Sequence, residues 1–210
     1  RDLSNGLNSQ WTEKVTSVKG KDCNTFWIVS LVSNKYYSYK VDDITGINPI
    51  PFISNVNYNS IDPRGYLKVS PDGKKLASAT YSAGGNPFVL GNGKLHLYSF
   101  NDVTGEVSND GIELISNTTI DGSPYGVEFS PLSGKLYTST FDGNNNRLYQ
   151  FDLQNINIVS SKILIRAQTG YRGALQLAPN GKIYATVPFD YYTGTNFLNA
   201  INSPEEIGTA

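Results

Sequence analysis

The sequence predicts an all-β fold made of repeated four-stranded units. A strand–turn–strand segment occurs three times, as GYLKVSPDGKKLASAT at 65–80, YGVEFSPLSGKLYTST at 125–140 and GALQLAPNGKIYATV at 173–187. Apolar residues alternate within each copy, as the two-residue period of a strand requires. Gly, Pro and Asn interrupt these runs at about the 8–12-residue spacing that is typical of all-β proteins.

The elements of each unit follow in order. The repeated segment supplies the first two strands, joined by a turn such as Pro71-Asp72-Gly73, where Pro fixes φ and Gly allows a positive φ. An aromatic motif predicts the third strand, as YYSY at 36–39, LYSF at 97–100 and LYQF at 148–151. A fourth strand is expected around residues 50–53, 112–115 and 156–165. Four antiparallel strands therefore make one unit.

Repeated four-stranded units of about this length are typical of a β-propeller, in which each unit is a blade. We expect units at about 11–55, 65–120, 125–165 and 173–202, which makes three complete blades and a partial one within a single domain, 1–210, or a fragment of one. A four-bladed ring closed by residues 1–10 is the smaller alternative.

Composition excludes several classes of function. The single cysteine, Cys23, and the single histidine, His96, cannot form an internal disulfide, a four-ligand Cys/His zinc site or a Cys-x-x-Cys redox pair. The net charge of −1 gives no global field to attract nucleic acid. No apolar run approaches the roughly 18 residues that span a bilayer. We therefore expect no nucleic acid partner, no membrane insertion and no cofactor.

The sequence offers little for catalysis. His96 alternates with leucines in a predicted strand, and no Gly-x-Ser-x-Gly elbow is present, so a serine hydrolase is disfavoured. Glu128 lies in a first strand, but Lys68 and Gln176 take the same place in the other copies, so the repeat builds no acidic pair. We expect these three side chains to line the central channel, and we assign no catalytic residue.

One loop offers a weak metal signal. Asp142, Asn144 and Asn146 place oxygen atoms at the first, third and fifth positions, as at the start of a calcium loop. Arg147 stands where such a loop has Gly, and Leu153 stands where it has Glu. Calcium here is the lesser alternative to a plain Asn-rich turn.

An ordered set of motifs resembles a known family. They are WTEKVTSV at 11–18, FWIV at 26–29, GYLKVSPDG at 65–73, YGVEFSP at 125–131, GALQLAPNGKIY at 173–184 and FLNAINSP at 197–204. Together they look like the WD40-like propeller region of large Bacteroidota surface proteins, which carry PKD-like modules and a gliding-motility-associated sorting domain. The stretch 19–23 departs from the family, which usually has a His there. The resemblance implies an extracellular or cell-surface location, reached by type IX secretion through a sorting domain outside these residues.

Strand direction predicts which face binds. Loops between second and third strands, and loops between units, must lie opposite the Pro-Asp-Gly turns. We call this the long-loop face: residues 62–64, 81–93, 123–125, 141–146, 169–172 and 188–196. Its candidate ligand-binding residues are Arg64, Tyr81, Phe88, Phe141, Tyr171, Arg172, Phe189, Asp190, Tyr191 and Tyr192.

Exposed aromatic rings beside amide and charged groups suit a glycan or a protein partner, because the rings give contact area at small entropy cost. The sequence therefore predicts a non-enzymatic adhesion or binding module whose partner is an extracellular protein or glycan. A lactonase-like propeller enzyme and a structural spacer between adhesive modules are the alternatives.

Overall fold

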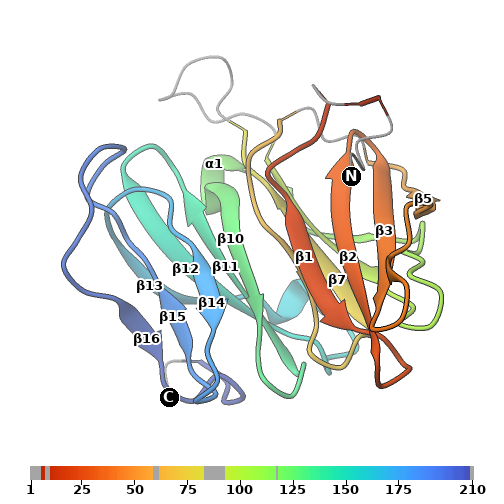
Figure 1. Ribbon diagram of the computed structural model, residues 1–210. Coiled ribbons are helices and arrows are strands. Elements are labelled where there is room, and N and C mark those ends of the chain that lie inside the picture. The colour runs from red at the N-terminus through yellow and green to blue at the C-terminus, as the bar shows by residue number, and fades with distance from the viewer. Residues whose placement is uncertain (1–5, 8–9, 59–61, 83–92, 117, 209–210) are drawn as a thin grey trace.

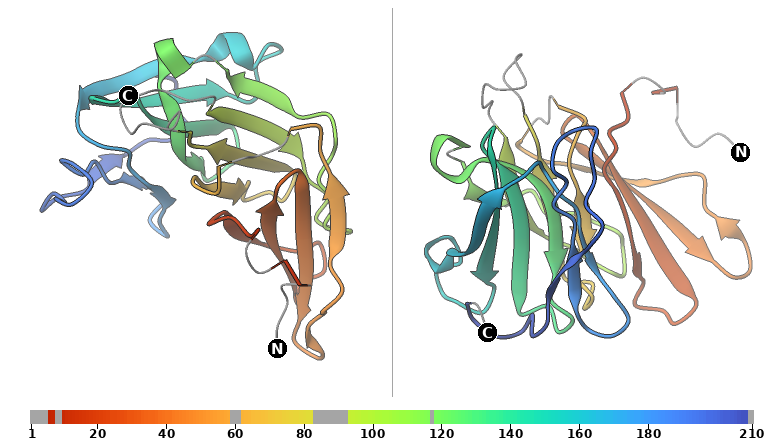
Figure 2. Two further views of the ribbon diagram at one scale, coloured as in Figure 1. Left: turned by 90° about the horizontal axis from the view of Figure 1, so that it is seen from above. Right: turned by 90° about the vertical axis from the view of Figure 1, so that its left-hand side faces the viewer.

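The computed structural model describes residues 6–7, 10–58, 62–82, 93–116 and 118–208. Its strands form four antiparallel sheets that stand side by side around an arc (Figures 1 and 2). Blade 1 contains β1 (Val15–Lys19), β2 (Thr25–Val32), β3 (Lys35–Asp42), β4 (Gly46–Ile47) and β5 (Phe52–Asn55). Blade 2 contains β6 (Leu67–Val69), β7 (Lys75–Thr80), β8 (Lys94–Ser99) and β9 (Ile112–Ile115).

Blade 3 contains β10 (Ser123–Phe129), β11 (Lys135–Phe141), β12 (Asn145–Asp152) and β13 (Ile163–Thr169). Blade 4 contains β14 (Leu175–Leu177), β15 (Ile183–Ala185) and β16 (Asn199–Ile201). Strands pair in sequence order within each blade, except that β4 and β5 both pair with β3. The helical elements of the described chain are short, α1 (Thr118–Asp121) and the 3-10 turn η1 (Val159–Ser161). The predicted all-β propeller of four-stranded blades is confirmed.

The turns between first and second strands follow the repeated sequence. Ser70 Oγ accepts a hydrogen bond from the Lys75 amide at 2.9 Å and donates one to Asp72 Oδ1 at 2.6 Å. The third residue after the anchor serine or alanine has a positive φ in every copy: Gly73 at +70°, Ser133 at +62° and Gly181 at +77°. Glycine reaches this left-handed region without steric cost, and in blade 3 the serine adopts it instead.

Middle strands are buried on both faces where a blade has a neighbour on each side. All seven residues of β11 are buried, and β7 is buried from Leu76 to Thr80. Small residues let the sheets approach, and their polar atoms bond to neighbouring backbone. Thr138 Oγ1 donates to the Gly126 carbonyl at 2.9 Å, and Ser139 Oγ donates to the Gly173 carbonyl of the next blade at 2.5 Å.

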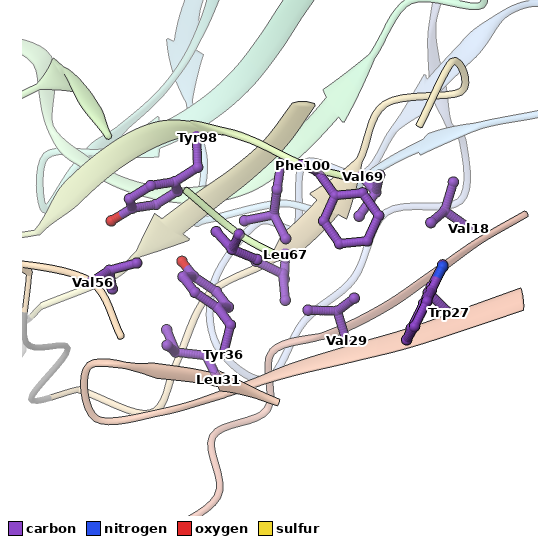
Figure 3. Packing of buried hydrophobic residues seen from close by; sticks show 12 residues of the cluster. Val18, Trp27, Val29, Leu31, Tyr36, Val56, Leu67, Val69, Tyr98 and Phe100 are labelled. Carbon is purple, nitrogen blue, oxygen red and sulfur yellow. The ribbon is translucent and has the colours of Figure 1, made fainter. Parts of the chain in front are cut away.

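Aromatic and aliphatic residues fill the space between blades. Between blades 1 and 2, Trp27 and Tyr36 pack against Tyr98 and Phe100 (Figure 3). The rings of Tyr36 and Tyr98 meet edge to face at 5.6 Å, and Trp27 Nε1 donates to the Asp102 carbonyl at 2.8 Å. Burying one such side chain contributes about 1.5–3 kcal/mol. Tyr36 and Tyr98, both in the aromatic third-strand motif, thus join two blades.

One predicted strand begins later in the sequence than expected. The fourth strand of blade 3 begins at Ile163, whereas the sequence predicted it around 156–165. Before it, Asn157 Oδ1 accepts from the Ser160 amide at 3.1 Å, and Ser161 Oγ accepts from the Asp152 amide at 2.9 Å. These side-chain bonds to the backbone stabilise a turn in place of a strand ladder.

Candidate functional site

The long-loop face carries a cavity of about 770 Å³, here called the long-loop cavity. It lies where the β11–β12 turn, the β13–β14 connection and the β15–β16 loop meet. Its wall is formed by Arg64, Phe141, Gly143, Asn144, Gly170, Tyr171, Arg172, Phe189, Asp190, Tyr191 and Tyr192. The structure therefore brings together eight of the ten candidate ligand-binding residues; of the other two, Tyr81 is not part of this wall and Phe88 lies outside the described residues.

Arg172 is surrounded by tyrosine rings. Its guanidinium carbon lies 4.6 Å from the ring centre of Tyr81, 4.8 Å from that of Tyr125 and 5.1 Å from that of Tyr171. The faces of these rings attract a cation electrostatically. Its Nη1 atom is buried and has no hydrogen-bond partner. Within the described part of the chain, no carboxylate forms an ion pair with this side chain.

Arg64 contrasts with Arg172 because a carboxylate already holds it. Its Nε lies 2.9 Å from Asp62 Oδ1, and its Nη2 lies 2.6 Å from Asp62 Oδ2, which is the two-bond geometry of a strong pair. These hydrogen bonds raise the pKa of Arg64. The cavity thus contains one neutralised arginine and one without a carboxylate partner.

The aromatic residues form a chain from the core to the surface. Phe141 contacts Tyr171 with ring centres 4.8 Å apart, Tyr171 contacts Tyr191 at 6.0 Å, and Tyr191 contacts Tyr192 at 5.0 Å. Phe141 is 6 % exposed, whereas Tyr191 is 66 % and Tyr192 is 92 % exposed. Phe189, also at the rim, is 69 % exposed.

Two of the rings expected to be exposed are buried. Tyr81 is 3 % exposed, since it follows β7 directly, and Phe141 is the last residue of β11 instead of a loop residue. Tyr81 nonetheless supports the cavity, because it packs against Arg172. Phe88 lies outside the described residues, as does most of the loop 81–93.

Asp190 brings a negative charge to the cavity rim. Its Oδ1 accepts hydrogen bonds from the amides of Tyr192 at 2.8 Å and Thr193 at 2.7 Å. The bond from the Tyr192 amide is the largest of the interactions that lower the pKa of Asp190. The carboxylate is therefore ionised at neutral pH and held in the turn that presents Tyr191 and Tyr192.

Asp142 and the side-chain amide nitrogen of Asn146 have partners within the protein, whereas Asn146 Oδ1 is buried without a hydrogen-bond partner. Asp142 Oδ1 accepts from the Asn144 amide at 2.9 Å, and its Oδ2 lies 2.5 Å from Arg147 Nη1. Asn146 is buried, and its side-chain amide donates to the Tyr171 carbonyl at 3.1 Å. No three His, Cys, Asp or Glu side chains among the described residues lie together as metal ligands would. Calcium binding stays a sequence prediction.

The three expected channel residues also meet. Lys68 Nζ lies 2.9 Å from Glu128 Oε2 and 2.8 Å from Gln176 Oε1. Glu128 Oε2 also accepts from the Leu177 amide at 2.9 Å. They line a second cavity of about 520 Å³, here called the channel cavity, whose wall includes residues of β1, β6, β10 and β14.

Tyr125 packs behind the long-loop cavity, against Arg172, and was not among the candidate residues. Its ring lies against Arg172 and stands 5.3 Å from the ring of Tyr66. Burial raises the pKa of Tyr125 to about 12, so its hydroxyl stays protonated. A signal was present in the repeat, because Tyr125 stands where the other copies have Gly65 and Gly173.

The face opposite the long loops exposes apolar side chains at its turns. The aliphatic residues exposed there are Ile44, Val103, Leu132 and Ile156. Their positions in the first-to-second and third-to-fourth connections place them at turn tips, where no neighbouring strand covers them.

His96 is not near the long-loop cavity wall. It is buried in β8, with its ring centre 4.4 Å from that of Tyr58 and its Nε2 3.7 Å from Glu113 Oε2. Burial lowers the pKa of His96 to about 4, so the side chain is neutral at pH 7.

Comparison with known proteins shows the fold. No family model matches the chain. Three similar structures are the nidogen/laminin complex (TM-score 0.54, 9 % identity, 90 % of this chain and 59 % of that one), hydrazine synthase from Kuenenia stuttgartiensis (0.53, 16 %, 88 % and 57 %) and TolB from Acinetobacter baumannii (0.51, 16 %, 91 % and 41 %). At these identities the likeness establishes the propeller fold.

In sequence, the chain is 29 % identical over 92 residues to the Tol-Pal system protein TolB from Blochmanniella pennsylvanica, a match covering 43 % of this chain and 19 % of that protein. The chain thus spans little more than half the length of the matched chains of the nidogen/laminin complex and of hydrazine synthase, and less of these two TolB proteins. None of its described helices has the length and apolar character needed to cross a membrane.

Proposed function

We propose that this chain is a non-enzymatic binding module that recognises a glycan in the long-loop cavity. The proposal rests on one observation: a cavity of about 770 Å³ has exposed aromatic residues at its rim and, in its wall, an arginine without a carboxylate partner. Pockets for small ligands measure about 300–1,000 Å³ and combine apolar walls with a few polar groups. This cavity has that size and that mixture.

The rim residues supply what a sugar ring needs. Tyr191 and Tyr192 expose most of their surface. Asp190 stabilises the turn that contains them by accepting hydrogen bonds from the Tyr192 and Thr193 amides. Aromatic side chains lose little conformational entropy when they bind, because only two dihedral angles must be fixed. Their rings can cover the C–H faces of a sugar while Asp190 accepts hydrogen bonds from hydroxyl groups.

The lactonase-like alternative is less well supported. The charged residues of the described cavity wall are Arg64, Arg172 and Asp190, and Asp190 is held in a turn. His96 lies elsewhere, and Glu128 is paired with Lys68 in the channel cavity. A protein partner is the second candidate, because exposed aromatic residues such as Tyr192 are also enriched at protein interfaces.

We propose further that the module acts outside the cell, at the surface or secreted, after export by a type IX-like route. The support is the ordered motif set between residues 11 and 204, which resembles propeller regions of exported Bacteroidota proteins. The secretion machinery would then be a partner through a sorting domain outside these residues. Protease treatment of intact cells tests the location, since protection of the chain until lysis would contradict it.

Binding to immobilised glycans tests the function. We expect the double variant Tyr191→Ala/Tyr192→Ala to bind about 30-fold more weakly than the parent, because truncating an aromatic anchor costs about 2 kcal/mol. The matched control is Leu132→Ala, which removes an exposed apolar side chain from the opposite face. The proposal fails if the control loses binding and the double variant keeps it, or if the parent binds no glycan.

A further inference from the structure

Most charged side chains around the long-loop cavity have a partner of opposite charge or a backbone hydrogen bond, and one does not. Asp62 neutralises Arg64, and Arg147 neutralises Asp142 at the neighbouring turn. Asp190 receives two backbone amides. Arg172 is the cation of this group that the described chain leaves without an anion. Its partners are aromatic rings, which attract the charge but do not accept hydrogen bonds in the plane of the guanidinium group.

The position of Arg172 is fixed by its surroundings. Rings of Tyr81, Tyr125 and Tyr171 surround the guanidinium group. The preceding residue is anchored through its backbone, because the Tyr171 amide donates to the Pro188 carbonyl at 2.7 Å and the Tyr171 carbonyl accepts from Asn146. A side chain held in this way loses little further entropy when it binds, which favours affinity.

A partly buried guanidinium group needs a specific partner. Its N–H groups form a planar fork that matches the two oxygens of a carboxylate, and such charge-assisted bonds are about twice as strong as neutral ones. The Nη1 atom is buried without an acceptor, so the described protein leaves part of the hydrogen-bonding capacity of this group unused, at a cost in free energy. Resting on the proposed function, we propose that the glycan bound in this cavity carries a carboxylate, as in a uronic acid, which pairs with Arg172.

The other wall residues place the rest of the ligand. Asp190 would repel a carboxylate, so the anion belongs at Arg172 and the hydroxyl groups at Asp190. Tyr191 contacts Tyr171, which itself packs on Arg172, so a sugar whose carboxylate reaches Arg172 can lie against the exposed ring of Tyr191. The same sugar would therefore touch both the cation and the aromatic rim.

Comparing each uronate with its methyl ester, which removes the negative charge of the carboxylate, tests whether that carboxylate pairs with Arg172. The probes are hexamers of galacturonic, glucuronic and mannuronic acid, the methyl ester of each, and sulfated and neutral hexasaccharides, titrated calorimetrically into the full chain. We expect at least one uronate to bind tenfold or more tightly than its own methyl ester. Arg172→Gln should bring this ratio close to one, and Arg172→Lys should leave it intermediate, because lysine keeps the charge but loses the fork.

Lys182→Gln is the matched control, because it removes the same charge from a turn on the opposite face, and it should leave the ratio unchanged. A thermal unfolding curve for each variant shows that it is folded. The inference is overturned if ester and acid bind alike, if only sulfated glycans bind, or if Arg172→Gln keeps the ratio. Binding of neutral glycans alone, weakened by Tyr191→Ala/Tyr192→Ala, would overturn the inference and leave the proposed function standing. No binding to any glycan would overturn both.

Discussion

The two arginines of the long-loop cavity differ because only one of them has a carboxylate close to it in the sequence. Arg64 follows Asp62 by two positions, so the carboxylate reaches its guanidinium group within the same loop. Arg172 follows Tyr171, whereas its other ring partners are distant in the sequence: Tyr81 directly follows β7, and Tyr125 lies in β10. The local spacing at 62–64 makes the first pair visible in the sequence. The environment of Arg172 depends on residues from three segments that are distant in the sequence, and no local pattern predicts it.

At the residue scale, His96 predicts a pH dependence of stability. Burial lowers its pKa from 6.5 to about 4, so the folded protein binds a proton less readily than the unfolded chain. The contribution of neutral His96 to the free energy of unfolding is fully present above pH 6.5. As the pH falls toward 4, the free energy of unfolding decreases by about 3 kcal/mol. Urea denaturation across this range measures the loss.

The matched variant is His96→Phe, which keeps an aromatic ring beside Tyr58 and cannot be protonated. Because His96 is the single histidine of the chain, the variant should lose most of the pH dependence between 6.5 and 4. An unchanged slope in the variant would show that another group is responsible.

At the element scale, the strands were predictable because their signals are local. Alternating residues in 125–140 specify β10 and β11, and the Pro-Asp-Gly and Pro-Asn-Gly turns specify where the chain reverses. The start of β13 was not predictable from periodicity, since side chains such as Asn157 bond to the backbone before it. Likewise, Tyr81 and Phe141 looked like loop residues, but strands β7 and β11 reach to or next to them and bury them.

The first strands of three blades are linked by Lys68, Glu128 and Gln176, which predicts measurable coupling. The Glu128 side chain is 5 % exposed, so solvent screens its ion pair with Lys68 only weakly. A double-mutant cycle with Lys68→Met and Glu128→Gln should give a coupling free energy of about 1–2 kcal/mol in denaturant unfolding. Additive effects, with coupling under about 0.5 kcal/mol, would mean that the pair does not join the blades.

At the scale of the whole molecule, strand direction predicted which loops share a face but not the cavity that they form. Because consecutive strands run in opposite directions, 62–64, 141–146 and 188–196 lie on one face regardless of which side chains they carry. Which side chains meet there depends on how far each blade is rotated from the next, and that follows from packing between blades. The contact between Tyr125 and Arg172 was therefore not predicted. Phe189, Tyr191 and Tyr192, in contrast, lie on the expected face, at the rim of the cavity.

The most direct test of the account is a crystal structure of the chain soaked with the uronate hexamer that binds most tightly. We predict sugar density in the long-loop cavity, with a carboxylate within hydrogen-bond distance of Arg172 and a sugar ring against Tyr191 or Tyr192. Density in the channel cavity beside Lys68 and Glu128, or on the opposite face near Leu132, would contradict the account.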